Sequence, residues 1–226
     1  MLVLPELTGV NVDVQETALA QTGYVNSTSV TVNMSWAVGD TPVDKCGLSN
    51  DNTTFTWFDP VASRAWTLPP GDGEKTVYFK CNDTSGYISN TVYDTVILDT
   101  VKPIASGIGC IGVNVCPPGS CGWPWYDPVV GVTLNEDGLC RFNFSENATP
   151  PAVGYVGMPY TLWPDNSTSP PNKLFGSGIG QINYYDWVYV RTSCIDYAGN
   201  EVADKLWANI SMVSGWCTTT ANGTYA

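Results

Sequence analysis

Histidine is absent from the 226 residues of the chain. This absence excludes His-dependent catalytic triads, imidazole metal ligands and imidazole pH switches. Basic residues are scarce as well, because 9 Lys and Arg stand against 21 Asp and Glu, and the formal charge of −12 would repel nucleic acid at long range. No apolar run approaches the length that crosses a bilayer. We therefore expect neither a nucleic-acid partner nor a membrane span.

Leucine is also sparse, at 12 residues, whereas Val and Thr number 25 and 24. β-Branched and aromatic side chains favour pleated strands over helices. The 22 Gly and 16 Pro, together with abundant Asn and Asp, supply the turns between strands. The composition therefore predicts an all-β chain, long enough for one large domain or two small ones.

The eight cysteines form an even set, which an oxidising compartment would pair. A second pattern indicates the same compartment, because nine Asn-x-Ser/Thr sequons occur, about three times the number expected from the Ser and Thr content of the chain. The sequons are Asn26, Asn33, Asn52, Asn82, Asn143, Asn147, Asn166, Asn209 and Asn222. We interpret the chain as a secreted or cell-surface glycoprotein with covalent N-linked glycans.

Two segments of the chain repeat one pattern. Val77-Tyr-Phe-Lys-Cys81-Asn-Asp83-Thr-Ser-Gly86 and Val188-Tyr-Val-Arg-Thr-Ser-Cys194-Ile-Asp196-Tyr-Ala-Gly199 both read Val-Tyr-apolar-basic and then Cys-x-Asp-x-Ser/Ala-Gly. The two extra residues of the second copy preserve the alternation of strand side chains. An alternating run precedes each copy, at 29–36 and at 129–134, and each run is followed by a cysteine, Cys46 or Cys140. The chain is therefore predicted to hold two strand-rich units.

We predict these units at 9–102 and 103–217, with an N-terminal tail at 1–8 and a C-terminal tail at 218–226. The division follows the strand expected at 91–98, where Pro103 ends ladder pairing. The second unit opens with a Cys-rich segment at 110–126 and holds a Pro-rich insertion at 146–178, which shows no strand or helix period. The insertion carries Tyr155, Tyr160, Trp163 and Phe175, which we interpret as packing or subunit contacts rather than as a sugar site.

Strand parity indicates which way the sequons face. Asn33, Asn82, Asn143 and Asn209 each lie out of phase with the apolar residues of their predicted strands, so all four are expected on the outer face. A glycan acceptor must lie on that face. Polar residues favour it in any case, so glycosylation of these sites stays a prediction.

The repeated segments resemble a known group, the tandem immunoglobulin-like β-sandwich domains of prokaryotic, in particular archaeal, cell-surface and appendage proteins. The resemblance rests on the segment from Trp66 to Val92 with the linker Ile97-Leu-Asp-Thr-Val-Lys-Pro103, and on Tyr189-Val-Arg191 with Cys194-Ile-Asp-Tyr-Ala-Gly-Asn200-Glu201. It covers about half the chain. It implies two disulfide-stapled immunoglobulin-like sandwiches and an extracellular spacer, adhesin, surface-layer or filament subunit, with no catalytic residues.

The same resemblance implies that Cys46 pairs with Cys81 and that Cys140 pairs with Cys194, each bond joining an early strand to a late one. The remaining cysteines allow three connectivities; they are Cys110, Cys116, Cys121 and Cys217. Because the first and last strands of such a sandwich can run parallel, Cys217 is expected to meet Cys116 or Cys121 rather than Cys110. The alternative of a zinc site is disfavoured, since these spacings contain no Cys-x2-Cys.

Enzyme chemistry has little support in the sequence. Gly107-x-Gly109-x-x-Gly112 matches the dinucleotide-binding pattern, but it opens a Cys- and Pro-rich segment rather than a strand-to-helix turn. We expect no catalytic residue, no metal and no cofactor. Calcium is a weak alternative, because hard oxygen donors are expected at the sandwich ends; these are Asp40, Asp44, Asp51, Asp83, Asp137 and Asp196. No Asp-x-Asp-x-Asp-Gly run occurs, which favours solvated turn acids.

The N-terminal residues combine an apolar segment, Leu2-Val-Leu4, with the alternating run Gly9-Val10-Asn-Val12-Asp-Val14-Gln15. One interpretation is that Val10, Val12 and Val14 form the first strand of the chain's own first domain. The sharper hypothesis is that residues 1–15, or part of them, add as a strand to the sheet edge of an adjacent copy. Its subunit contacts would be Leu2, Leu4, Val10, Val12 and Val14. Head-to-tail addition does not close, so it builds filaments.

The sequence therefore predicts an extracellular structural protein that is not an enzyme. It would be a subunit of a glycosylated cell-surface filament, a pilus-like appendage, or of a surface layer, and its partners would be copies of itself. The alternative is a monomeric cell-surface adhesion or carbohydrate-binding module that uses aromatic loops, with Trp125 and Trp163 as candidate contacts.

Overall fold

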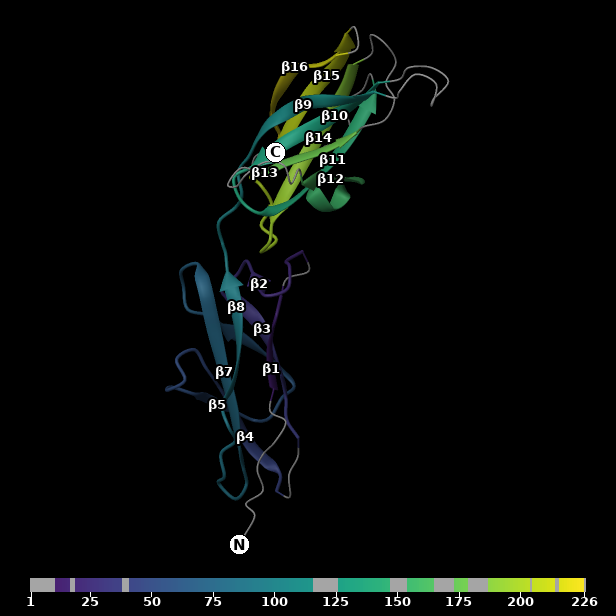
Figure 1. The fold of residues 1–226 in the computed structure, drawn as a ribbon. Helices are drawn as coiled ribbons and strands as arrows, with labels where there is room; N and C mark the ends of the chain where they lie inside the picture. Colours follow the sequence, from purple (N-terminus) through teal and green to yellow (C-terminus); the bar gives the residue numbers. More distant parts are fainter. Residues whose placement is uncertain are drawn as a thin grey trace. The chain divides into compact units, whose positions relative to one another are not determined.

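The computed structural model describes residues 11–16, 19–37, 41–115, 126–146, 154–164, 173–178, 187–203, 205–213 and 216–225. The chain forms two compact units, Met1–Thr100 and Val101–Ala226 (Figure 1), close to the division expected from the sequence. Within the described residues the only helix is a 3-10 turn, η1 (Tyr155–Gly157). No helix in this part of the chain is long and apolar enough to span a membrane. The chain is all-β, as the composition predicts.

The first unit is a two-sheet sandwich. Its strands are β1 (Asn11–Gln15), β2 (Tyr24–Val25), β3 (Ser29–Ser35), β4 (Val43–Ser49), β5 (Thr56–Phe58), β6 (Ser63–Thr67), β7 (Gly73–Asp83) and β8 (Val92–Leu98). One sheet has the order β1-β3-β6 and the other the order β2-β8-β7-β4-β5. The paired strands are antiparallel except β2 and β8, which run parallel. This is an immunoglobulin-like arrangement.

Alternation along the strands places the core between these sheets. Val30 and Val32 of β3 face Val77 and Phe79 of β7, and all four are buried in one cluster. The residues between them in sequence point to the outer faces, because successive strand side chains alternate. The alternating apolar residues of the run at 29–36 and of the first repeat copy thus form the core.

The first strand belongs to its own domain. β1 pairs with β3 from Asn11↔Ser35 to Gln15↔Thr31, and Val12 and Val14 are only 5% and 1% exposed. Their prediction as subunit contacts is therefore wrong, and the alternative interpretation holds for them. The physical reason is that burying such a Val removes apolar surface from water, which stabilises the fold by about 1.5–3 kcal/mol. Leu2, Leu4 and Val10 lie outside the described residues.

The second unit is built from one continuous sheet that folds over on itself. Its strands are β9 (Ala105–Val115), β10 (Tyr126–Leu134), β11 (Gly138–Glu146), β12 (Tyr160–Pro164), β13 (Lys173–Gly178), β14 (Trp187–Asp196), β15 (Lys205–Val213) and β16 (Trp216–Tyr225). The order is β16-β15-β14-β11-β12-β13-β10-β9. β12 pairs with β11 and then with β13, and so links the two halves. Val130 and Val132 of one half share a core with Val188 and Val190 of the other, which makes a second sandwich.

Two expectations about the second unit are wrong. Residues 218–225, predicted as a tail, continue β16, which pairs with β15 from Lys205↔Tyr225 to Val213↔Trp216. The insertion at 146–178, predicted without strands, contributes β12 and β13. β12 and β13 have 5 and 6 residues, too few to show a clear period. The residues from Thr218 to Asn222 are exposed, so β16 lacks the apolar alternation that would reveal a strand.

Each unit is stapled by a buried disulfide between two central strands. Cys46 of β4 and Cys81 of β7 stand directly opposite each other, with a Cα–Cα distance of 4.0 Å. Cys140 of β11 and Cys194 of β14 are joined in the same way, with a Cα–Cα distance of 4.1 Å. These are the two pairings that the resemblance implied.

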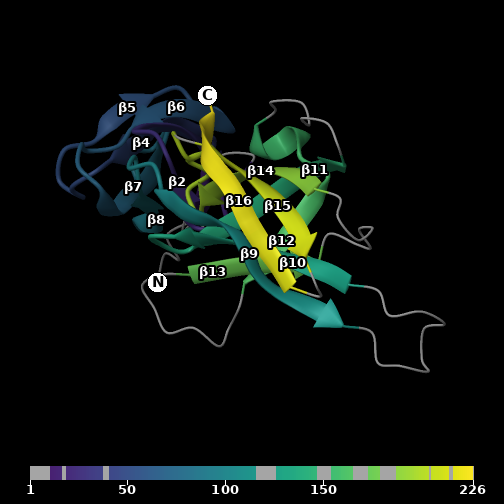
Figure 2. The same ribbon diagram turned by 90° about the horizontal axis from the view of Figure 1, so that it is seen from above.

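A third disulfide joins the two ends of the folded sheet. Cys110 of β9 is bonded to Cys217 of β16, and the N–H of Cys110 donates a hydrogen bond of 2.9 Å to Oγ1 of Thr219; Figure 2 shows the two strands crossing. The expectation that Cys217 meets Cys116 or Cys121 is wrong, because β16 begins beside the middle of β9 rather than beyond its end. Cys116 and Cys121 lie outside the described residues.

The repeated Cys-x-Asp motif forms the same turn in both units. In the first, the carboxylate of Asp83 accepts hydrogen bonds of 2.9 Å from the N–H groups of Ser85 and Tyr87. In the second, the carboxylate of Asp196 accepts bonds of 2.8 Å from the N–H and the Nδ2 of Asn200. Both Asp residues are buried, at 3% and 2% exposure. Each acid thus satisfies backbone donors of the hairpin that follows its disulfide.

The glycine of this motif is required by the backbone, since Gly86 has a φ of 87°. We expect Gly86→Ala to lower the free energy of unfolding of the first domain by about 1 kcal/mol. The cost is conformational, because a Cβ at this position would meet nothing within 4 Å. Gly86→Asn should cost less, since Asn tolerates positive φ. Urea unfolding measures both, with the exposed Ser85→Ala as control; equal losses for Ala and Asn would contradict this account.

The pKa of Asp83 lies below its ordinary value, chiefly because the Thr41 hydroxyl donates a hydrogen bond to its carboxylate; burial opposes this shift, and N–H donors of the turn reinforce it. The ionised form is therefore favoured by folding. This contribution to stability is fully present above the unfolded pKa of about 3.9 and is lost as the pH falls through the lower folded pKa.

We expect Asp83→Asn to lower the urea midpoint at neutral pH, and the gap to the wild type to close as the pH falls below about 4. Thr41→Val removes the first donor alone and should reproduce part of this change. Urea midpoints across the acid range measure both variants. If the difference in urea midpoint between the wild type and Asp83→Asn widened toward low pH, ionised Asp83 would not stabilise the fold.

Candidate functional site

One side of the first domain leaves a strand edge open. β6 stands at the end of its sheet and pairs only with β3 among the described strands. The N–H of Leu68 donates to the carbonyl of Thr28 across this pair. Because such bonds involve every second residue of an antiparallel strand, the backbone groups of Ser63, Ala65 and Thr67 point away from β3. They therefore point to the open edge.

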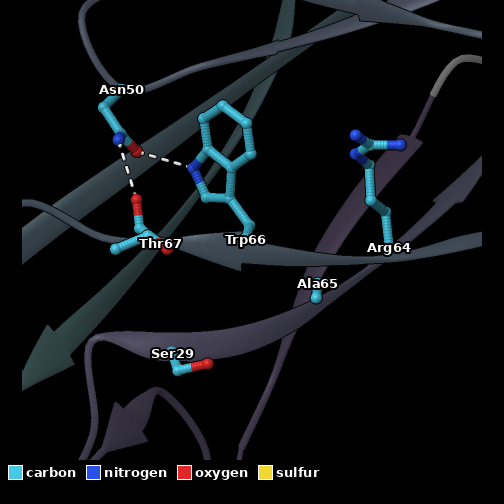
Figure 3. Close-up of a pocket in the computed structure, with 6 residues that line it drawn as sticks. All are labelled: Ser29, Asn50, Arg64, Ala65, Trp66 and Thr67. Carbon is cyan, nitrogen blue, oxygen red and sulfur yellow. Dashed lines mark hydrogen bonds between the residues drawn. The ribbon is translucent and has the colours of Figure 1, made fainter.

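A groove of about 340 Å³ follows this edge (Figure 3). Its lining residues are Ser29, Asn50, Arg64, Ala65, Trp66 and Thr67. Asn50 follows β4 of the other sheet, and its amide joins two residues at the end of β6. Its Nδ2 donates to the carbonyl of Thr67 at 3.0 Å, and its Oδ1 accepts from Nε1 of Trp66 at 2.8 Å. The groove thus lies on the open side between the two sheets.

The same open side brings the end strands of both sheets together. The guanidinium carbon of Arg64, on β6, lies 4.5 Å from the ring centroid of Phe58, on β5, and β5 is the end strand of its own sheet. The carbonyl of Thr67 is already bonded to Asn50. The outward backbone groups of Ser63 and Ala65 remain as ladder positions for an added strand, which binds an open edge through main-chain hydrogen bonds.

The described sequons lie where parity predicts. Asn33, Asn82, Asn143 and Asn209 each lie between two inward-facing residues of their strands, and each is half-buried on the outer face. Two of these amides have polar partners, since Asn33 Nδ2 donates to Asp13 at 3.4 Å and Asn82 Oδ1 accepts from the N–H of Lys45 at 3.1 Å. Asn52 and Asn222 are exposed and Asn26 is half-buried, while Asn147 and Asn166 lie outside the described residues.

The outer face of β14, β15 and β16 carries aromatic rings around one arginine. Tyr189 and Trp207 stack with centroids 5.1 Å apart and an interplanar angle of 7°. The guanidinium carbon of Arg191 lies 4.6 Å from the centroid of Tyr225 and 5.7 Å from that of Tyr189. Trp187, on the same face of β14, is 38% exposed. Aromatic faces can pack against a sugar ring, and the N–H groups of a neighbouring guanidinium can donate hydrogen bonds to its hydroxyl groups.

This aromatic cluster is packed tightly enough to raise the pKa of one of its tyrosines. Burial raises the pKa of Tyr225 to about 12, with Arg191 acting in the opposite direction. Its hydroxyl donates to the carbonyl of Thr192 at 3.4 Å. Nε of Arg191 is buried without a hydrogen-bond partner among the described residues. Tyr225 is therefore a neutral packing residue at neutral pH and holds the end of β16 against β14.

Three of the acids considered as calcium ligands accept hydrogen bonds within turns. The carboxylate of Asp51 accepts bonds of 2.8 Å from the N–H groups of Thr53 and Thr54 and from the hydroxyl of Ser49. These bonds, those from Thr54 and Thr53 first, hold the pKa of Asp51 well below its usual range. Asp83 and Asp196 are bonded within their turns as described above. Asp44 and Asp137 are exposed, and Asp40 lies outside the described residues.

One aromatic residue of the insertion can be placed. Tyr155 is 5% exposed, its ring lies 4.8 Å below the guanidinium carbon of Arg141, and its N–H donates to Oε1 of Glu201 at 2.7 Å. Burial raises the pKa of its hydroxyl. The packing interpretation is confirmed for this residue. The side chains of Tyr160, Trp163 and Phe175, and the whole of Trp125, lie outside the described part of the chain.

Sequence reasoning missed both the open edge and the aromatic cluster. A signal for the cluster existed, because Trp207 has the same strand parity as Asn209 and the rule that placed the Asn outward places the Trp outward too. The open edge had no local signal, since the end position of β6 depends on which strands pair over long sequence separations.

No protein-family model matches this chain, and no curated protein matches it. Among solved structures, the chain is similar to the fibronectin(III)-like modules of CbhA from Clostridium thermocellum, with a TM-score of 0.40 and 10% sequence identity. The match covers 88% of this chain and 91% of that chain. A likeness at this level carries no functional argument, so the fold assignment rests on the described strands and their pairing.

Proposed function

We propose that this chain is a structural subunit of a glycosylated extracellular assembly, a cell-surface filament or a surface layer. In this assembly, residues 1–8 of one copy add as a strand along β6 of the next. The open edge of β6 carries the proposal, because the backbone groups of Ser63 and Ala65 face away from β3 beside the groove of about 340 Å³. Buried disulfides in both domains support an oxidising, extracellular location.

The donor must precede β1, since Val12 and Val14 are buried in their own core. The segment Leu2-Val-Leu4 alternates in side-chain direction when extended, so its two leucines would share the face turned toward the half-buried Trp66. Pro5 has no N–H and would end the added ladder. An interaction between two different surfaces of the same chain does not close on itself, and repetition therefore gives an open filament.

Deletion of residues 1–8 should leave two folded domains and abolish polymer formation. Ala65→Pro should also abolish it, because the N–H of Ala65 points to the open edge and its removal spares the ladder to β3. Ala65→Thr keeps the N–H and is the matched control. Size-exclusion chromatography and negative-stain microscopy measure assembly, and circular dichroism checks the fold.

A truncated chain that still polymerises would disprove strand donation by residues 1–8. If the truncated chain stays monomeric but a folded Ala65→Pro variant still polymerises, residues 1–8 remain the donor strand. In that case β6 is not the acceptor.

A second candidate function is adhesion through carbohydrate binding. It is favoured by the aromatic cluster of the second domain, where Trp187 is 38% exposed beside the Tyr189–Trp207 stack. Such a module would act as a monomer, and its ligand would be a sugar chain lying across the outer face of β14 and β15.

For this candidate, Trp187→Ala should reduce binding to a glycan array by about tenfold, the loss expected for about 1.4 kcal/mol of contact. Tyr93→Ala, which alters a residue that is 67% exposed in the first domain, is the control and should leave binding unchanged. Equal binding by the wild type and the Trp187 variant would reject this face.

A further inference from the structure

A second groove lies on the outer face of the other sheet of the first domain. It has a volume of about 290 Å³ and is lined by Lys45, Trp57, Asn82, Gly86 and Ile88. These residues come from the adjacent strands β5, β4 and β7 and from the turn that follows β7. Trp57 is 43% exposed and Ile88 is 61% exposed. The groove is therefore apolar on two of its sides.

Trp57 lies over the sheet because a glycine stands opposite it. Gly47 is its register partner, and a Cβ on Gly47 would come within 3.2 Å of Cδ2 of the indole. The ring thus lies over the backbone of Gly47, and its exposed surface lines the groove. The ammonium group of Lys80 lies 3.7 Å from the centroid of Phe55 and 5.9 Å from that of Trp57, so one cation contacts this aromatic pair.

Asn82 stands on the rim of the groove, and a hydrogen bond to the neighbouring strand orients its side-chain amide. Oδ1 accepts a hydrogen bond of 3.1 Å from the N–H of Lys45, and no partner of Nδ2 occurs among the described residues. The ammonium group of Lys45 is itself paired with Asp59 at 2.5 Å. Asn82-Asp-Thr84 is a sequon. The nitrogen that would carry a sugar is therefore available while the oxygen stays bonded to the sheet.

Attachment of the sugar leaves these contacts intact. An activated glycosyl diphosphate supplies the sugar: the bond from its C1 to the diphosphate oxygen breaks, a bond from C1 to Nδ2 of Asn82 forms, and the proton released from Nδ2 leaves with the diphosphate. One N–H of the amide remains, and Oδ1 keeps its bond to Lys45.

We propose that the sugar attached to Asn82 folds back into this groove and stacks on the exposed surface of Trp57. A pyranose ring presents C–H groups on one face, which pack against the negative face of an indole and remove apolar surface of Trp57 and Ile88 from water. The volume is at the low end for ligand pockets, which suits the one or two sugars nearest the asparagine. The inference rests on the glycosylation that forms part of the proposed function.

The test uses the full chain secreted from a eukaryotic host, with its glycans trimmed to a single N-acetylglucosamine as the probe. Thr84→Ala removes the sequon but leaves Asn82 and its bond to Lys45, and Thr84→Ser keeps the sequon as the matched control. Thermal unfolding is compared in the wild-type and Trp57→Ala backgrounds. Thr54→Ala removes the sequon of the exposed Asn52 and controls for loss of sugar elsewhere.

We expect Thr84→Ala to lower Tm by about 2–4 °C in the wild-type background and by less than half of that when Trp57 is Ala. Thr84→Ser and Thr54→Ala should leave Tm unchanged. An equal shift in both backgrounds, or no shift in either, would overturn the proposal.

Peptide mass spectrometry of the same samples separates this inference from the proposed function. Sugar on other sequons but not on Asn82 would overturn the inference alone. Sugar on no sequon would overturn both the inference and the glycosylated character of the assembly. If the polymerisation experiment disproved strand addition, the inference about the sugar on Asn82 would still hold.

Discussion

Each domain depends on one pair of adjacent central strands that a buried disulfide joins across the sheet. The bonds Cys46–Cys81 and Cys140–Cys194 close loops with sequence separations of 35 and 54 residues, which stabilises the fold by about 3–4 kcal/mol each in the chain-entropy account. Their second effect is on register. A shift of one residue would turn every side chain to the opposite face, so a bonded pair that faces the core also determines which residues face outward. The positions of Asn82 and Arg191 on the outer faces follow from this constraint.

The repeated segment also determines which residues stand on the outer surface of both domains. Each copy reads Val-Tyr-apolar-basic before its cysteine, so a tyrosine and a cation stand outward on the central strand. In the first domain Lys80 lies over the ring of Phe55, and in the second Arg191 lies over the ring of Tyr225. A cation held between aromatic neighbours covers the outer face of a sheet without a second layer of protein. The same local pattern that buries the cysteine therefore also builds the exposed aromatic faces.

Local alternation explains which parts of the fold could be predicted from the sequence. β3, β7 and β10 show the period of two, and the Cys-x-Asp-x-x-Gly motif contains its own acceptor and its own glycine, so their structure follows from neighbouring residues. β12 and β16 could not be predicted, because β12 is short and β16 is exposed along much of its length. The Cys110–Cys217 bond and the open edge of β6 depend on how distant strands meet, and no residue near either one encodes that. The sequons fall between these cases: parity gives the face on which each strand-borne Asn lies, whereas the groove beside Asn82 requires Gly47 and Trp57 on two other strands.

The placement of the sequons also bears on how such a subunit would associate. Asn33, Asn82, Asn143 and Asn209 stand on sheet faces, and β6 itself contains no sequon. Sugars on the faces would hinder the stacking of one sheet on another, which is the other way for an exposed β-surface to bury apolar area. The edge of β6 would stay accessible, because its outward backbone groups lie in the plane of the sheet rather than above it. Association would then be directed to the edges and would extend in one dimension. In the proposed assembly, sugars on these sequons would exclude face-to-face contacts between sheets and would leave strand addition as the remaining contact.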